Sequence, residues 1–226
     1  VILVSRLSAS ASEILAGALQ DYGRAIIVGD THTHGKGTVQ SISQLGEDDT
    51  LGAARITTSI YYRISGDSTQ IQGVSSDIVV PSPYGYMQIG EDTFPNPVQW
   101  SPIKPARFLA MQKMDDIISA LNEKSRLRKE NDQKFANYRQ LLERIGSIDK
   151  TERLPLDLES RMKFARTEKE LLKLQTELLK VEQEKIGSEE KAEADVALGE
   201  AINIMTDYIK LTKNPAEPSL PVAGLE

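Results

Sequence analysis

The chain has no cysteine among its 226 residues and only two histidines. The missing cysteine excludes disulfide bonds, thiolate metal sites and a cysteine nucleophile, although it suits an oxidising or a reducing compartment equally. Uninterrupted apolar runs are short, and none approaches the roughly 18 residues that a membrane-spanning helix needs. Positive charge is also in deficit, since 27 Lys and Arg stand against 33 Asp and Glu. Without a clustered surplus of basic residues, nucleic acid is not expected as a partner.

The remaining composition is that of an ordinary soluble protein, 39% hydrophobic and 27% charged, and the length fits one large domain or two small ones. Residue 1 is Val, no signal peptide precedes it, and the first four residues already have the pattern of a buried strand. We therefore expect the chain to be the C-terminal part of a longer protein, with any targeting segment in the missing part.

The first 81 residues alternate short apolar runs with glycine and turn residues, which is typical of an α/β fold. Val1–Val4 is continuously apolar, Ser10–Tyr22 has apolar residues at helical spacing, and residues 23–30 place β-branched residues between glycines. Strand, helix and strand within about 30 residues form a βαβ unit. Further strands are predicted over GTVQSISQ (37–44), ARITTSIYYRIS (54–65) and SDIVVP (76–81).

A sharp change of composition follows a proline-rich connector over residues 82–105. From residue 106, Lys, Glu, Gln and Leu dominate, and apolar residues recur every three or four positions. The apolar stripes are Phe135, Tyr138, Leu142 and Ile145; then Leu171, Leu174, Leu178 and Val181; then Val196, Ile204, Tyr208 and Leu211. Breaks at GSIDKTERLP and IGSEE predict three or four helices over residues 106–212, before a flexible tail over residues 213–226.

The apolar stripes of this region are narrow and the opposite faces are heavily charged. We expect the helices to pack as a small bundle or against the first region, since the heptad pattern is too short to predict a self-associating coiled coil. The sequence therefore predicts an α/β region with a mixed sheet, followed by an α-helical C-terminal region.

Four serines lie in the stretch SRLSASASEIL (5–15), which runs into the first predicted helix. Serine is a poor helix former, so this concentration needs a reason. Ser10 and Glu13 have the spacing of a capping box, which is a purely structural explanation. The position also suits chemistry, because a serine where a buried strand turns into a helix lies beside outward-pointing N–H groups that can hold an oxyanion.

A serine hydroxyl is a weak nucleophile and needs a base, and the loop GDTHTHGKGTVQ (29–40) offers two kinds. One is a histidine oriented by an aspartate, for which the candidates are His32, His34, Asp21 and Asp30. The other is Lys36, which lies between two glycines and can act as a neutral amine if burial lowers its pKa. The structural alternatives are a solvated lysine and two polar loop histidines.

The glycines of this loop do not form a nucleotide-binding motif. GxxxxGK[ST] needs four residues between its glycines and a hydroxyl after the lysine, whereas five residues separate Gly29 from Gly35 and a third glycine follows the lysine. A metal site at His32 and His34 is also disfavoured, because neither a third histidine nor suitably spaced carboxylates accompany them.

The residues after the loop favour lysine over histidine. If KGTVQ is extended, Lys36, Thr38 and Gln40 lie on one face of the strand, because side chains alternate. Gln40 can then hold Lys36 by a hydrogen bond without adding charge, whereas a carboxylate in its place would favour the ammonium form.

Three stretches together resemble a known family. SASASEILAGALQDYGRAIIVGDTHTHGKGTVQ (8–40) closely resembles the catalytic segment of carboxy-terminal processing proteases, also called tail-specific proteases. YYRISGDSTQIQGVSSDIVVP (61–81) is similar to the strand and loop that follow in that family. EDTFPNPVQWSPI (91–103), with the charged helical region after it, resembles the C-terminal extension of the long bacterial envelope members.

The resemblance implies a serine endopeptidase with a Ser-Lys dyad and no cofactor. It makes Ser10 the nucleophile, Lys36 the general base and Gln40 the residue that orients the lysine, and it gives half of the oxyanion hole to the backbone N–H of Ala11. It further implies protein or peptide substrates with nonpolar C-termini and a place in the bacterial periplasm or cell envelope. Independently of the resemblance, the charged helical region is a candidate docking surface for an adaptor protein.

The chain departs from the family in two ways. The loop before Lys36 is one residue longer than the common EPTFGKG, and Ser76 stands where proline is usual. The family's PDZ domain, the first half of its protease core and the glycine that gives the second oxyanion donor all lie outside this chain. We therefore expect half of an active site, with little or no proteolytic activity from the chain alone.

Two other functions stay open at this point. One is a non-catalytic interaction module, whose helical region docks an adaptor or a second subunit while the serines merely cap a helix. The other is a Ser-His-Asp hydrolase, which is disfavoured because the first strand-helix turn lacks the flanking glycines of G-x-S-x-G.

Overall fold

The computed structural model describes residues 1–46, 51–148, 156–166, 169–170, 173 and 195–213. The second predicted apolar stripe, Leu171 to Val181, and the predicted tail beyond residue 213 lie outside the described residues. No helix in the described part of the chain is both long and apolar enough to cross a membrane.

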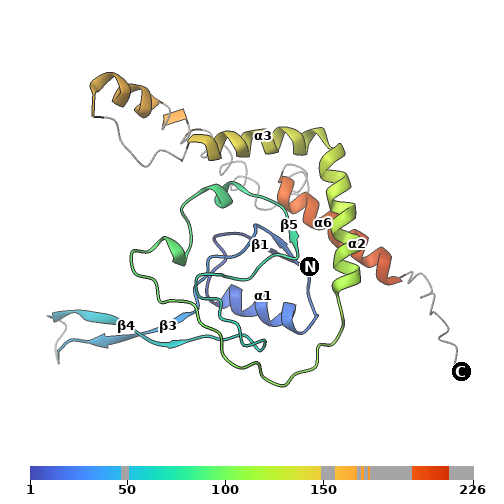
Figure 1. Ribbon diagram of the computed structural model, residues 1–226, viewed down its shortest axis with the longest axis horizontal. Helices are drawn as coiled ribbons and strands as arrows, with labels where there is room; N and C mark the ends of the chain where they lie inside the picture. The colour runs from blue at the N-terminus through green and yellow to red at the C-terminus, as the bar shows by residue number, and fades with distance from the viewer. Residues whose placement is uncertain (47–50, 149–155, 167–168, 171–172, 174–194, 214–226) are drawn as a thin grey trace, which may run out of the picture.

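A three-stranded parallel sheet forms the centre of the first region (Figure 1). Its strands are β1 (Ile2–Val4), β2 (Ile27–Gly29) and β5 (Ile78–Val79), in the order β1-β2-β5. The helix α1 (Ala11–Asp21) connects β1 to β2, so the predicted βαβ unit is confirmed. The catalytic candidates follow the carboxyl ends of β1 and β2, which lie at the same edge of a parallel sheet.

Two longer strands form a separate antiparallel hairpin that projects from the body of the molecule (Figure 1). They are β3 (Thr38–Gln44) and β4 (Ala53–Ile60), with a bulge in the register between Val39 and Gln40. The predicted α/β class is therefore confirmed, with its parallel and antiparallel pairs in two distinct sheets. The strand predicted over residues 54–65 ends at Ile60, and the chain then turns, with the Gly66 N–H donating to Arg63 O and the Arg63 N–H to Asp67 O.

The described residues of the connector and the helical region contain two short 3-10 turns and three long helices. The turns are η2 (Pro83–Tyr86) and η3 (Glu91–Thr93). The helices are α2 (Asp115–Asn131), α3 (Gln133–Ile148) and α6 (Val196–Lys213), and residues 158–166 are also helical. The predicted α-helical C-terminal region is confirmed, although its first helix begins at residue 115 rather than near residue 106.

The two faces of the parallel sheet are covered by different parts of the chain. Alternate side chains of a strand point to opposite faces, so Ile27 faces α1 while Ile26 and Val28 face the helical region. The larger core joins Ile26, Val28, Ile78 and Val80 to Met114, Leu121, Phe135, Ala201 and Ile204. The helices were expected to pack as a small bundle or against the first region, and both kinds of packing occur. Helices α2 and α6 contact each other and also cover the sheet.

Candidate active site

Ser10 lies at the turn between β1 and α1, directly before the first helical residue. Its φ of +57° is in the left-handed region, which a residue other than glycine rarely adopts. Ser10 and Glu13 form the predicted capping box, in which the Ser10 N–H donates to Glu13 Oε2 at 2.8 Å. The residue is exposed, so its hydroxyl is presented to the surface at a fixed and strained position.

The neighbouring serines have other hydrogen-bond partners. Ser8 Oγ accepts from the Ser5 N–H at 3.1 Å, and Ser12 Oγ donates to Ala9 O at 2.9 Å. Both bonds shape the turn that leads into α1. Neither of these two hydroxyls takes part in the capping box of Ser10 and Glu13.

The buried carboxylate of Glu13 also holds the loop that carries Lys36. Its Oε2 accepts from the Lys36 N–H at 2.9 Å, and its Oε1 accepts from the Gly35 N–H at 2.7 Å and from Thr33 Oγ1 at 2.5 Å. Bonds to an ionised acceptor are the strong kind. The capping spacing could predict only the bond to Ser10, because the other donors are 20 or more residues away in the sequence.

The backbone on both sides of Lys36 is fixed by Gln70 and Ile71. The Ile71 N–H donates to Gly35 O at 2.7 Å, and the Gly37 N–H donates to Gln70 Oε1 at 3.0 Å. A Cβ at Gly35 would lie 2.6 Å from Ile71 O, and one at Gly37 would lie 2.6 Å from Gln70 N. The two glycines are therefore required by the close approach of these backbones.

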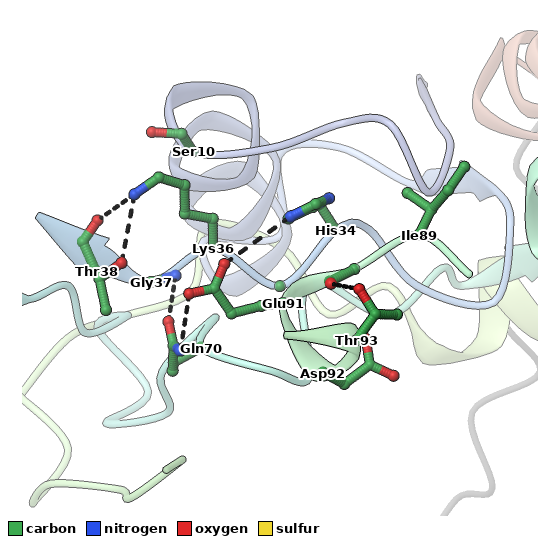
Figure 2. A network of polar contacts seen from close by, with 12 residues as sticks. Ser10, His34, Lys36, Gly37, Thr38, Gln70, Ile89, Glu91, Asp92 and Thr93 are labelled. Carbon is green, nitrogen blue, oxygen red and sulfur yellow. Dashed lines mark hydrogen bonds and ion pairs between the residues drawn. The ribbon is translucent and has the colours of Figure 1, made fainter. Parts of the chain in front are cut away.

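The half-buried side chain of Lys36 points toward Thr38 (Figure 2). Its Nζ donates to Thr38 O at 2.9 Å and lies 3.3 Å from Thr38 Oγ1. Ser10 and Lys36 are both described, and the structure has no hydrogen bond between their side chains. The predicted contact between the amine of Lys36 and the hydroxyl of Ser10 is therefore not made in this structure.

Lys36, Thr38 and Gln40 line the same cavity, which agrees with their predicted place on one face of the strand. The cavity has a volume of about 400 Å³, and its opposite wall comes from Glu91 and the connector residues that follow it. Gln40 is exposed and pairs with Thr57 across the hairpin, and its side chain does not reach Lys36 in this arrangement. Ala11, the predicted oxyanion donor, is the first residue of α1, where backbone N–H groups have no intrahelical acceptor.

The histidines are not assembled into a Ser-His-Asp site in the described structure. Asp21 pairs with Arg63 at 2.5 Å, and Asp30 accepts from the backbone N–H of Arg6 and from Ser82. His32 contacts the Arg6 guanidinium, and His34 Nε2 lies 3.9 Å from Glu91 Oε2. Within the described residues, no group of three or more His, Asp or Glu could hold a metal ion.

One carboxyl near the sheet has a perturbed pKa. Burial raises the pKa of Asp77, and this outweighs the lowering effect of the bonds from the Ile27 N–H and from Gln20. The Ile27 N–H donates to Asp77 Oδ2 at 2.7 Å, and Gln20 Nε2 donates to Oδ1 at 2.8 Å. Asp77 therefore joins β2, α1 and the segment before β5 rather than the candidate dyad.

Comparison with known proteins agrees with this geometry. Residues 1–80 match peptidase family S41, and residues 84–210 match the family described as the C-terminal domain of tail specific protease. The chain is 34% identical over 177 residues to the tail-specific protease of Haemophilus influenzae, covering 75% of this chain and 25% of that protein. It is 54% identical over 83 residues to the carboxy-terminal-processing protease of Bartonella bacilliformis, covering 37% of this chain and 18% of that protein.

The carboxyl-terminal-processing protease of a Picosynechococcus species is 44% identical over 96 residues, which are 41% of this chain and 22% of that protein. The chain thus spans a quarter or less of the length of these three relatives. The two matched families together cover the strands, the candidate dyad and the helices that close the core. The chain belongs to the tail-specific proteases of peptidase family S41.

Proposed function

We propose that this chain carries the Ser-Lys dyad of a tail-specific serine endopeptidase. Lys36, in its neutral form, takes the proton of Ser10 as the Ser10 oxygen attacks the scissile carbonyl. The resulting ammonium gives the proton to the leaving amine, and water then hydrolyses the acyl-enzyme. The Ala11 N–H donates to the oxyanion that forms at the attacked carbonyl.

The observation that carries this proposal is the shared carboxylate of Glu13. It accepts from the backbone N–H groups of Ser10 and Lys36, which fixes the two backbones relative to one another. The chemistry then needs only a side-chain rotation, in which the Lys36 amine leaves Thr38 and turns to Ser10. We propose that Gln40, which lines the same cavity, then accepts a hydrogen bond from the amine.

The test compares Ser10→Ala, Lys36→Ala and Lys36→Arg with the wild type in the intact protein. Each should lower kcat for a peptide by at least about 1000-fold while leaving the circular dichroism spectrum unchanged. A serine-directed fluorophosphonate should label the wild type and fail to label Ser10→Ala. Near-normal kcat in Lys36→Ala would reject the dyad and make His34 the base to test.

The substrates we propose are proteins with nonpolar C-termini, in the bacterial periplasm or cell envelope. Support comes from the family and from the names of the relatives, which describe processing at the carboxyl terminus. The chain alone is expected to have little or no activity, because Ser10 and Ala11 are exposed and no described segment covers them. Robust cleavage of a nonpolar-tailed peptide by the chain alone would contradict this expectation.

An adaptor protein is proposed as the partner of the helical region. Most apolar stripe residues of α3 are buried in the chain's own core, but α6 keeps a second, exposed stripe at helical spacing. It consists of Leu198, Ile202, Met205 and Ile209, which are 36 to 47% exposed. Sedimentation of the protein with Ile202→Asp and Met205→Asp tests this, since loss of a complex with unchanged peptide hydrolysis would separate docking from catalysis.

A further inference from the structure

Gln70 is a buried amide whose side-chain hydrogen-bonding groups all face partners. Its Oε1 accepts from the Gly37 N–H at 3.0 Å, and its Nε2 donates to Glu91 Oε1 at 3.2 Å (Figure 2). The same Nε2 also donates to Val98 O at 2.9 Å. A flipped amide would set its NH₂ against the Gly37 N–H and its oxygen against two acceptors, so the partners fix its orientation. Gln70 therefore joins the loop of the proposed base to two residues of the connector.

Glu91 extends this network to His34, on the N-terminal side of Lys36. Its Oε2 lies 3.9 Å from His34 Nε2, and its backbone N–H donates to His34 O at 3.0 Å. His34 in turn donates its N–H to Ser8 O at 2.9 Å, at the turn that leads to the nucleophile. The pair Gln70 and Glu91 thus holds the chain on both sides of Lys36 (Figure 2).

The segment that presents Glu91 is anchored to the sheet by a buried arginine. The Arg6 guanidinium donates to Ile89 O and, at 2.8 Å, to Thr33 O, and it forms an ion pair with Asp92 at 3.3 Å. Arg6 is only 7% exposed, so its guanidinium is shielded from water, whereas the Asp92 side chain is half exposed. Glu91 is therefore held by a fixed backbone and does not depend on a freely moving loop.

The Glu91 carboxylate forms no ion pair with Lys36 in the described structure, although both residues line the same cavity. The side-chain partners of Glu91 in the described structure are Gln70 and His34. A carboxylate free to approach the amine would favour its ammonium form and weaken it as a base. By occupying Oε1 of Glu91, Gln70 restrains this carboxylate as well as the loop.

We propose that Gln70 and Glu91 are positioning residues for the dyad, so that the start of the C-terminal domain becomes a working part of the active site. This inference rests on the proposed function of Ser10 and Lys36. A displacement of about 1 Å at a catalytic group can lower the rate by about 100-fold. Loss of either positioning residue therefore lowers kcat and leaves KM nearly unchanged.

The experiment measures kcat, KM and the folded fraction of the intact protein for Gln70→Ala, Glu91→Ala, Glu91→Gln and Gln72→Ala. The two truncations at positions 70 and 91 should lower kcat by about tenfold or more, with KM within about twofold of the wild type. Glu91→Gln keeps an acceptor oxygen for Gln70 and should recover most of the rate. Gln72 is exposed, and Gln72→Ala is the matched control expected to equal the wild type.

Two results would overturn the inference. One is a decrease in kcat that is fully explained by a smaller fraction of folded protein. The other is a Glu91→Ala variant that is folded and has the kcat of the wild type. Since Gln70 is fully buried, Glu91→Ala decides the question if Gln70→Ala does not fold. Failure of the proposed function is distinguishable, because Lys36→Ala would then stay active, whereas failure of the positioning role alone leaves Lys36→Ala inactive.

Discussion

Ser10 and Lys36 donate their backbone N–H groups to the same atom, Oε2 of Glu13, over 2.8 and 2.9 Å. The two residues are 26 positions apart, yet one buried carboxylate sets the distance between their backbones. Such a link has no need to touch substrate. It keeps the strained serine turn and the lysine loop in register with one another.

Glu13→Gln is expected to lower both stability and activity strongly, although glutamine and glutamate have nearly the same size. A glutamine replaces one acceptor oxygen by an NH₂ group, which would then face donors that now share the carboxylate. We expect a loss of at least about 2 kcal/mol in the free energy of unfolding, from urea titration, and more than tenfold in kcat. Glu143→Gln, at an exposed position of α3, is the control. Wild-type stability and activity in Glu13→Gln would contradict the bridging role.

Gln40→Glu should move the pH dependence of activity, whereas Gln40→Ala should mainly lower the rate. A carboxylate beside Lys36 favours the charged amine, which cannot take a proton from Ser10. The acidic limb of the kcat profile is therefore expected to lie at higher pH in Gln40→Glu than in the wild type. A profile of kcat against pH for the three proteins measures this. Superimposable limbs would show that Gln40 does not adjoin the working base.

Gly37→Ala should destabilise the protein and inactivate it, because the new Cβ would lie 2.6 Å from a backbone atom of Gln70. The matched control is Gly85→Ala, whose Cβ would meet only Asp30 Oδ1 at 3.5 Å. Thermal unfolding and peptide hydrolysis of both variants measure the difference. Equal melting temperatures for the two would mean that the loop is looser than its hydrogen bonds indicate.

The stability of Asp77→Asn, measured as its free energy of unfolding, should rise relative to that of the wild type as the pH rises. Burial raises the pKa of Asp77 in the folded state above its ordinary value of 3.8, so folding favours the protonated form. That contribution is complete below the unfolded pKa and is lost as the pH rises through the folded pKa, while asparagine does not titrate. Urea unfolding of both proteins between about pH 3 and about pH 7 measures the difference. A constant or falling relative stability of the variant would be the opposite result.

The elements that the sequence predicted well are those with a local cause. The apolar period and turn residues located β1, α1 and β2, and the spacing of Ser10 and Glu13 predicted the capping box. The helical start was misplaced because residues 106–114 have good helix formers but are held by distant partners. Met111 donates its N–H to Tyr22 O, and Phe108 packs edge-on against Tyr22. Tertiary contacts of this kind override propensity.

The functional network was less predictable than the fold. Gln70 stands 33 positions from Gly37, and Glu91 stands 57 positions from His34. Each residue taken alone has the sequence environment of a polar loop residue, and only the folded chain brings them to one cavity. The proposed nucleophile and base lie within short sequence motifs, whereas the groups that hold them have no such local motif.

Because α6 packs against β2, the earliest and latest described parts of the chain share one core. Contacts that join such distant segments form late in folding. On the ribosome, the strands that support Ser10 must wait for residues beyond 200 before their second face is sealed. The newly made polypeptide therefore has no finished support for these strands until α6 has been made and has docked.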